Sequence, residues 1–160
     1  MKSAIAFGSI FLLTVGLSAQ TKAPMTNAER LASLQLSKMC SDEGKRFVAG
    51  IPKIKQDEIT SSSTHYNRAR NQCMVEVSKY IANTDKDGNR FTISSQEIYN
   101  SIDDVVLASF VTMTTKSDTT VMSCQLESAA GELLSCASDN RLVETARSLY
   151  EQRRNKLMNE

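Results

Sequence analysis

Residues 61–81 read SSSTHYNRARNQCMVEVSKYI, and this stretch separates a helical first half of the chain from a β-rich second half. In its later part Cys73, Val75 and Val77 recur at every second position, which is the period of a strand with one buried face. Its earlier part begins with Ser61–Ser63, a composition typical of a loop. We therefore expect a loop followed by a strand that continues to about Ile81.

The segment before this stretch predicts one long helix. Thr26 and Glu29 have the spacing of a capping box, in which each side chain accepts a hydrogen bond from an otherwise unpaired backbone amide. The helix should end near Gly50 and Pro52. Its inward stripe, at helical spacing, contains Leu36, Cys40, Gly44 and Phe47. Gly44 weakens the helix but allows another element to pack close to it.

The segment after residue 81 predicts strands joined by polar turns, whereas residues 51–60 have no clear pattern and are expected to be irregular. Turns are expected at Asn83–Asn89, Asn100–Asp104 and Lys116–Asp118. Strands are expected from Phe91 to about Ile98 and from Val105 to Thr114. Because the second of these is β-branched and apolar on both faces, we expect it at the centre of the sheet.

The stretch from Cys124 to Cys136 predicts a β-hairpin. Folding it at its middle places Cys124 opposite Cys136 and Leu126 opposite Leu134, all on one face. The connection is then Ala129–Gly131, with glycine at the left-handed position. A disulfide between the two cysteines therefore requires no rearrangement of the backbone.

A last helix is expected after Ser138 or Asp139, either of which can cap its first turn. The apolar stripe of this helix contains Leu142, Ala146, Leu149 and Leu157. The charged residues Arg147, Glu151 and Arg154 lie outside the stripe, and we expect them to face solvent.

The first 19 residues have the build of a secretory signal peptide. Lys2 precedes an apolar run that ends in small residues, and the run is too short to span a membrane comfortably. We expect cleavage after Ala19 to release a single exported domain, residues 20–160, into the periplasm or the medium. Gln20 stands where a lipoprotein signal requires cysteine, so no lipid anchor is expected. An uncleaved anchor is the alternative.

Charge and composition narrow the choice of partners. Loss of residues 1–19 removes one lysine and no acid, so the net charge falls from +1 to zero. A neutral protein has no overall field that attracts nucleic acid or an anionic membrane. We therefore expect neither nucleic acid nor an anionic membrane as a partner. We also expect no cofactor, and no transmembrane segment in the mature chain. Roughly two-thirds of the unfolded surface of a chain this long can be buried in one core.

The four cysteines, Cys40, Cys73, Cys124 and Cys136, are expected to form two disulfides. An even number of cysteines behind a signal peptide favours this state, and no C-x-x-C pair suggests a zinc site. Four cysteines allow three pairings. The hairpin geometry selects Cys124–Cys136, which leaves Cys40–Cys73 to join the first helix to the first strand. The predicted fold class is α+β: an N-terminal helix, an antiparallel sheet of about five strands, and a C-terminal helix.

Several short motifs occur together in this chain. They are Cys40-x-x-Glu43 on a helix ending in Phe47, His65-Tyr66-Asn67 before Cys73-Met-Val, and a C-x11-C hairpin before a last helix. The chain thereby resembles a group of small exported bacterial proteins of uncharacterised function that carry a Cys…His-Tyr-Asn…Cys pattern. The resemblance spans most of the mature chain. It implies two disulfides and an exported α+β domain, and it implies no activity.

A weak calcium-loop candidate lies between the first two predicted strands. If Gly88 is the sixth position of an EF-hand loop, Asn83, Asp85 and Asp87 occupy the first, third and fifth. The twelfth position, however, carries Ser94 instead of the bidentate glutamate. A polar turn containing Asp-Gly explains the same residues, so we expect no metal site here.

His65, the only histidine, is the other candidate for chemistry. Serines and Thr64 precede it, but nucleophilic catalysis requires a base that contacts its nucleophile, and sequence adjacency does not establish such contact. Oxidised cysteines would also exclude a cysteine–histidine mechanism. We therefore interpret His65, Tyr66 and Asn67 as a possible ligand loop with no catalytic residue. The adjacent acids Asp103 and Asp104 are explained by a turn.

These observations favour a non-catalytic exported protein that binds an unknown protein or small ligand. The alternative is a small hydrolase that uses carboxylates as its catalytic groups. That alternative requires two acids that converge from separate elements into a deep pocket.

Overall fold

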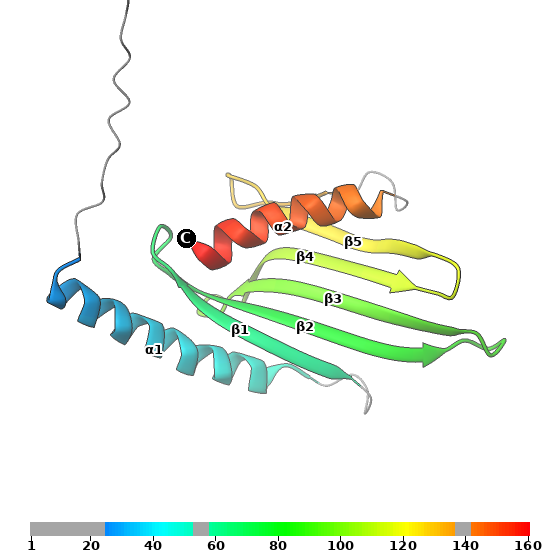
Figure 1. The fold of residues 1–160 in the computed structure, drawn as a ribbon, viewed down its shortest axis with the longest axis horizontal. Coiled ribbons are helices and arrows are strands. Elements are labelled where there is room, and N and C mark those ends of the chain that lie inside the picture. Colours follow the sequence, from blue (N-terminus) through cyan, green and yellow to red (C-terminus); the bar gives the residue numbers. More distant parts are fainter. Residues whose placement is uncertain (1–24, 53–57, 137–141) are drawn as a thin grey trace, which may run out of the picture.

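The computed structural model describes residues 25–52, 58–136 and 142–160. The elements are α1 (Asn27–Gly50), β1 (Ile59–Asn67), β2 (Gln72–Thr84), β3 (Arg90–Asn100), β4 (Val105–Thr114), β5 (Thr119–Glu127), β6 (Leu133–Ser135) and α2 (Val143–Asn159). The strands form one antiparallel sheet in the order β1-β2-β3-β4-β5-β6, so each strand pairs with its neighbour in sequence (Figure 1). The predicted α+β class is confirmed, with six strands instead of about five.

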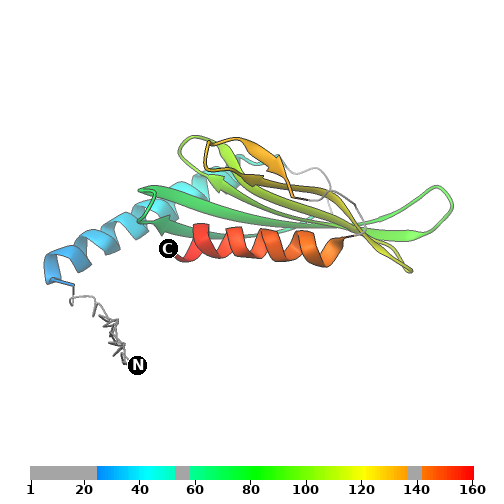
Figure 2. The ribbon, with the colours of Figure 1, turned by 90° about the horizontal axis from the view of Figure 1, so that it is seen from above.

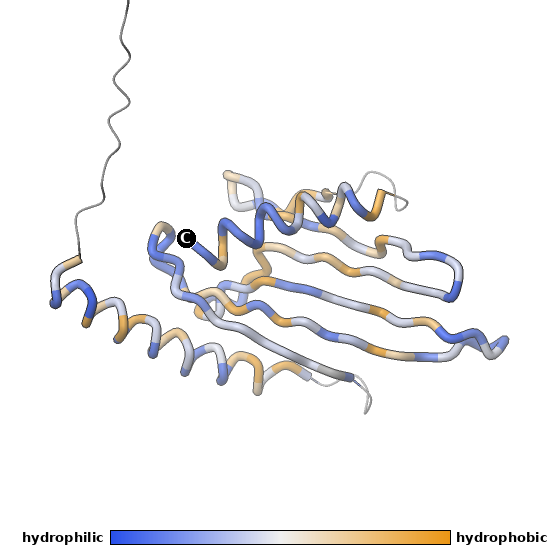
Figure 3. The backbone as a smooth tube through the Cα atoms, in the orientation of Figure 1, coloured by the Kyte–Doolittle hydropathy of each residue, from blue (hydrophilic) through white to orange (hydrophobic). Residues whose placement is uncertain are grey.

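The strand that sequence analysis missed is β1. Residues 59–63 belong to this strand, so the irregular segment and the serine loop expected there are wrong for these positions. β1 is an edge strand that pairs only with β2 along its whole length. It has no apolar alternation, and most of it is pale in a map of hydropathy (Figure 3). Pairing with β2 therefore creates this strand, because the intrinsic preferences of serine do not.

Two helices cover opposite faces of the sheet (Figure 2). On one face, Gly44 of α1 lies against Thr64 of β1 and Val75 of β2. On the other face, Glu76 of β2 contacts Arg154 of α2. Because each face has its own helix, all five residues from Cys73 to Val77 are buried. The expectation that this strand has only one buried face is therefore wrong.

The larger part of the core lies between the sheet and α2. Its members are Met74, Ile98, Leu107, Ala108, Phe110, Val121, Cys124, Ala146, Tyr150, Leu157 and Met158. Tyr150 is fully buried and its ring stacks on Phe110 with a centroid separation of 5.7 Å. The predicted stripe of α2 is wrong at Leu142 and Leu149, which are exposed. The stripe is confirmed at Ala146 and Leu157, and Tyr150 and Met158 complete the buried face of the helix.

The N-terminal cap of α1 agrees with the sequence analysis. The capping box is confirmed: the Glu29 amide donates to Thr26 Oγ1 over 3.2 Å, and the Thr26 amide donates to Glu29 Oε2 over 2.7 Å. α2 begins at Val143, and Leu142 before it forms no side-chain cap. The expected caps Ser138 and Asp139 lie outside the described residues.

Only the second half of α1 packs against the sheet. Cys40 and Gly44 are its buried residues. In the first half and centre of the helix, Leu31, Leu34 and Met39 are 60%, 63% and 65% exposed. Figure 1 shows this part of α1 extending beyond the end of the sheet. No helix in the described part of the chain is both long and apolar enough to cross a membrane.

The predicted hairpin and both disulfides are confirmed. Leu126 pairs with Leu134, and the Ser128 amide donates to the Glu132 carbonyl over 2.7 Å, which closes the three-residue connection Ala129–Gly131. Gly131 has a φ of 84°, the left-handed conformation that favours glycine. The disulfides are Cys40–Cys73, between α1 and β2, and Cys124–Cys136, across β5 and β6.

We predict that Gly44→Ala destabilises the protein by about 1–3 kcal/mol, the usual cost of overpacking. A Cβ atom at position 44 would collide with Thr64 Cγ2 and would lie 3.1 Å from Val75 Cγ2, so α1 would have to move away from the sheet. Urea unfolding followed by circular dichroism measures the effect.

Two further variants make this test specific. Gly50→Ala is the matched control, because nothing lies within 4 Å of a Cβ atom there, and it should leave stability almost unchanged. Thr64→Ser removes the nearest methyl group and should recover part of the loss in Gly44→Ala. Equal stability of the Gly44→Ala and Gly50→Ala variants would contradict the close approach of α1 to β1.

Candidate functional site

The three residues of the expected ligand loop lie on β1, so their placement in a loop is wrong. His65 pairs with Met74, Tyr66 with Cys73 and Asn67 with Gln72. Since successive side chains of a strand point to opposite faces, Tyr66 is on the α1 side of the sheet while His65 and Asn67 are on the α2 side. The three side chains therefore do not form one binding surface.

Asn67 joins the end of β1 to the end of α2. Its side chain is buried, and its Nδ2 donates to the carbonyls of Lys156 and Leu157 over 3.2 and 2.9 Å. Its Oδ1 accepts a hydrogen bond from the Arg70 amide over 2.9 Å. One amide side chain thus satisfies carbonyls at the end of α2 and an amide in the β1–β2 turn. This role is structural.

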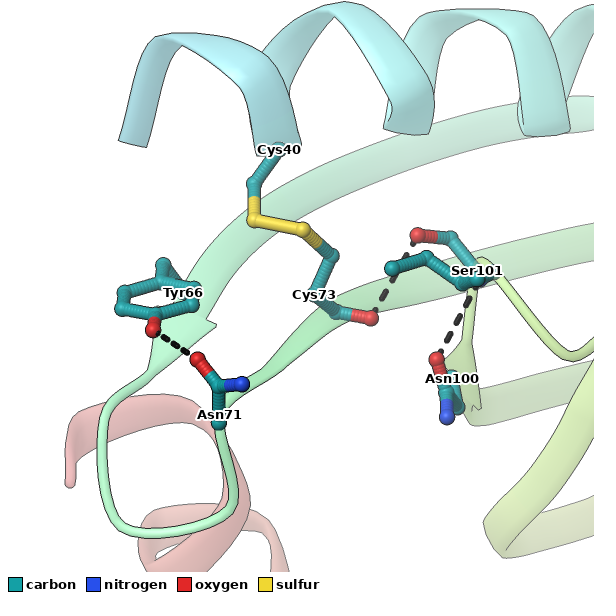
Figure 4. The surroundings of a disulfide bond; sticks show 7 residues. Cys40, Tyr66, Asn71, Cys73, Asn100 and Ser101 are labelled. Atoms are coloured by element: carbon teal, nitrogen blue, oxygen red, sulfur yellow. Dashed lines mark hydrogen bonds between the residues drawn. A yellow bond between two sulfur atoms is a disulfide. The ribbon is translucent and has the colours of Figure 1, made fainter. Parts of the chain in front are cut away.

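Tyr66 lies beside the disulfide that anchors α1 (Figure 4). Its hydroxyl donates to Asn71 Oδ1, and Asn71 has a φ of 52° in the β1–β2 turn. The carbonyl of Cys73 accepts from the Ser101 amide over 3.0 Å and from the Ser101 hydroxyl over 3.3 Å (Figure 4). Hydrogen bonds near this disulfide therefore hold the β1–β2 turn and the β3–β4 turn in place beside β2.

The arrangement around His65 does not resemble a catalytic triad. All four cysteines are in disulfides, so no thiol is available. The Ser63 hydroxyl donates to Glu76 Oε2 over 3.2 Å instead of to the histidine. His65 Nε2 is buried and has no hydrogen-bond partner among the described residues. Burial, and then the charge of Arg68, lower the pKa of His65, so the neutral imidazole is favoured in the folded protein.

The calcium-loop candidate is a tight turn in the structure. One Asp85 oxygen accepts from the amides of Asp87 and Asn89 over 2.9 and 2.8 Å, and the other accepts from Asn89 Nδ2 over 3.0 Å. These hydrogen bonds, above all those from Asn89, lower the pKa of Asp85. Gly88 has a φ of 84° in the same turn. Within the described ranges, no group of three or more His, Cys, Asp and Glu side chains could hold a metal ion.

Two largely buried carboxylates that sequence analysis did not single out are bound by arginines of α2. The first is Glu76, which is buried in β2. Arg154 donates from Nε to Glu76 Oε1 over 2.6 Å and from Nη2 to Oε2 over 2.8 Å. These hydrogen bonds raise the pKa of Arg154. The prediction that Arg154 faces solvent is therefore wrong. The one signal in the sequence is the position of Glu76 inside the apolar run of β2.

The second carboxylate, Glu127, is shared by two arginines. Arg70 in the β1–β2 turn donates to both of its oxygens, from Nη1 over 2.6 Å and from Nη2 over 3.0 Å. Arg153 Nη2 donates to Glu127 Oε2 over 2.6 Å. The hydrogen bonds from Arg70, with a further effect of Arg153, lower the pKa of Glu127. The pair of hydrogen bonds to Glu127 raises the pKa of Arg70. No local pattern links these three residues.

A cavity of about 560 Å³ adjoins this group, and we call it the Glu127 cavity. It is a half-open hollow bounded by the β1–β2 turn, the β5–β6 connection and the last turns of α2. Its lining includes Asn67, Arg70, Glu127, Gly131, Arg153 and Lys156. Its volume falls in the range of about 300–1,000 Å³ that is usual for small-molecule sites. A larger hollow of about 800 Å³ lies between the β2–β3 and β4–β5 turns, and its one carboxylate is that of Asp85.

Comparison of the chain with models of protein families, with curated proteins and with solved structures gave no match. The resemblance to the Cys…His-Tyr-Asn…Cys group stays a prediction.

We predict that Arg154→Met destabilises the protein by about 3–5 kcal/mol, because it leaves the buried Glu76 carboxylate without a counter-ion. Urea unfolding at neutral pH measures the loss. Arg46→Met, at an arginine whose side chain is 80% exposed, is the matched control and should have little effect. The double variant Glu76→Met/Arg154→Met should recover much of the stability. A small loss in Arg154→Met would contradict a buried pair.

We also predict that stability falls as the pH is lowered from about 7.5 to about 5.5, partly because of His65. The unfolded chain protonates this histidine near its ordinary pKa of 6.5, whereas the folded protein resists protonation. The unfolded state then binds more protons below this pH, so acid favours unfolding. The free energy of unfolding, measured against pH, should fall less steeply in His65→Gln. Identical slopes for the two proteins would contradict the lowered pKa.

Proposed function

We propose that this chain is an exported, disulfide-bonded protein that binds a ligand in the Glu127 cavity and catalyses no reaction. The observation that carries the proposal is the cavity itself. Three elements frame it, and the Glu127 carboxylate bonds to two of them besides its own strand, so the hollow is preformed. Preformed concave sites with a few well-placed polar groups are typical of ligand binding.

The side chains of the cavity suit binding better than hydrolysis. A carboxylate that acts as a general acid needs a raised pKa, whereas the arginines lower the pKa of Glu127. Ser128 lies at the same cavity, but its hydroxyl accepts hydrogen bonds from the amides of Ala130 and Glu132 and holds the turn. His65 is not among the lining residues. These contacts support a binding role over the alternative of a small hydrolase.

The proposal places the protein in the periplasm or the medium. Two disulfides are suited to an oxidising compartment, and the first 19 residues read as a signal peptide. We predict that the intact mass of the exported protein, alkylated without reduction, lacks residues 1–19 and carries no alkyl group. A full-length mass with four alkylated thiols would contradict export and oxidation together.

We predict that a thermal-shift screen of the mature protein against neutral, cationic and anionic small molecules finds a stabilising ligand. Ala130→Trp should abolish this shift, because Ala130 is an exposed residue at the cavity and the larger side chain fills it. Lys86→Trp, at an exposed residue of the β2–β3 turn, is the control and should preserve the shift. Stabilisation that survives in Ala130→Trp would place binding elsewhere and overturn the proposal.

The catalytic alternative is tested on the same protein. Ester, amide, phosphoester and glycoside substrates should show no turnover above that of buffer. Turnover that His65→Ala or Glu127→Gln abolishes would replace the binding proposal with a hydrolase.

A further inference from the structure

Three cations line the Glu127 cavity. Its lining includes the cations Arg70, Arg153 and Lys156 against the carboxylates of Glu127 and Glu160. The charged groups at the centre are partly removed from water, since the side chain of Glu127 is 11% exposed and that of Arg153 is 20% exposed. Arg153 Nε is also buried and has no hydrogen-bond partner among the described residues, so one donor of this guanidinium is left unsatisfied beside the cavity.

The second arginine at Glu127 is not needed to neutralise the carboxylate. Arg70 alone binds both Glu127 oxygens in a bidentate pair. The pair of Glu76 with Arg154 provides a comparison within the same chain, because there one bidentate arginine and the Ser63 hydroxyl satisfy a buried carboxylate. Relative to that pair, Arg153 is a surplus guanidinium, and it lies at the wall of a cavity.

The dipole of α2 does not explain why a second arginine, Arg153, binds Glu127. Cations near the end of a helix interact favourably with its carbonyls, but an exposed side chain is sufficient for this effect. Lys156 is an exposed cation in the last turn of α2. Arg153 is one turn further back, and its guanidinium is directed to Glu127 by a hydrogen bond of 2.6 Å.

We infer that the Glu127 cavity binds a small organic anion through a carboxylate or phosphate group, with Arg153 and Lys156 as the main contacts. The inference rests on the proposed function and adds the chemical class of the ligand. Guanidinium groups suit these anions because their planar donors match two oxygens at once. Arg70 and Glu127 act as positioning residues, since their bidentate pair holds the carboxylate that orients Arg153.

The test uses the mature protein with both disulfides intact and isothermal titration at constant ionic strength. The probes are inorganic phosphate, succinate and, as the uncharged analogue of succinate, succinamide. The protein should bind at least one of the two anions with a dissociation constant of about 1 mM or lower, and should bind succinamide at least about tenfold more weakly. The two anions separate a phosphate ligand from a carboxylate ligand.

Substitutions of single charged residues test whether the anion binds in this cavity. Arg153→Gln should weaken anion binding about tenfold, and Lys156→Gln, at an exposed residue that does not endanger folding, about threefold. Arg46→Gln removes the same charge on α1 and should leave binding unchanged. Glu127→Gln keeps a side-chain oxygen that can orient Arg153 but removes the negative charge that competes with the ligand, so it should strengthen binding several-fold while it lowers the melting temperature. A purely structural role of Glu127 predicts only the second effect.

Three results would overturn the inference. They are binding of neither anion by the wild-type protein, equal losses in Arg46→Gln and Arg153→Gln, or unchanged binding in both Arg153→Gln and Lys156→Gln. If the screen instead finds a neutral or cationic ligand that Ala130→Trp blocks, the inference fails while the proposed function stands.

Discussion

Strand β2 is covered on both faces, and most of the structure depends on this constraint. Cys73 and Val75 face α1, whereas Met74 and Glu76 face α2. A strand buried on both sides must be apolar on both, or must supply a partner for each polar group that it buries. Glu76 is the exception that requires such a partner. Arg154 provides it, and this contact fixes how α2 crosses the sheet.

Features encoded by neighbouring residues could be predicted from the sequence. The capping box of α1 needs only Thr26 and Glu29, and the β5–β6 hairpin follows from its two cysteines and Gly131. β1 could not be predicted, because its serines form a strand only when β2 is beside them. In α2 the burial of Ala146 and Leu157 could be predicted, but Tyr150 and not Leu149 stacks on Phe110 in the sheet.

The candidate site is harder to predict because its partners are distant in sequence. Arg70 is 57 positions from Glu127, and Arg154 is 78 positions from Glu76. From the sequence alone, arginines next to Glu151 in the last helix indicate a face that is exposed to solvent. The conspicuous His65-Tyr66-Asn67 motif has a different use, since Asn67 closes the end of α2 and Tyr66 supports a turn. Both carboxylate groups became recognisable only once α2 was placed across the sheet.

The Cys40–Cys73 disulfide also determines how mechanical load passes through the molecule. The part of α1 before Cys40 contacts the rest of the protein mainly through exposed side chains such as Arg68, which bonds to Ser33. Tension applied ahead of Thr26 would therefore unwind the first half of α1 and stop at the covalent bond. From there the force would enter β2 directly, without first peeling β1 from the sheet edge. The first half of α1 would thus extend under load before the sheet does.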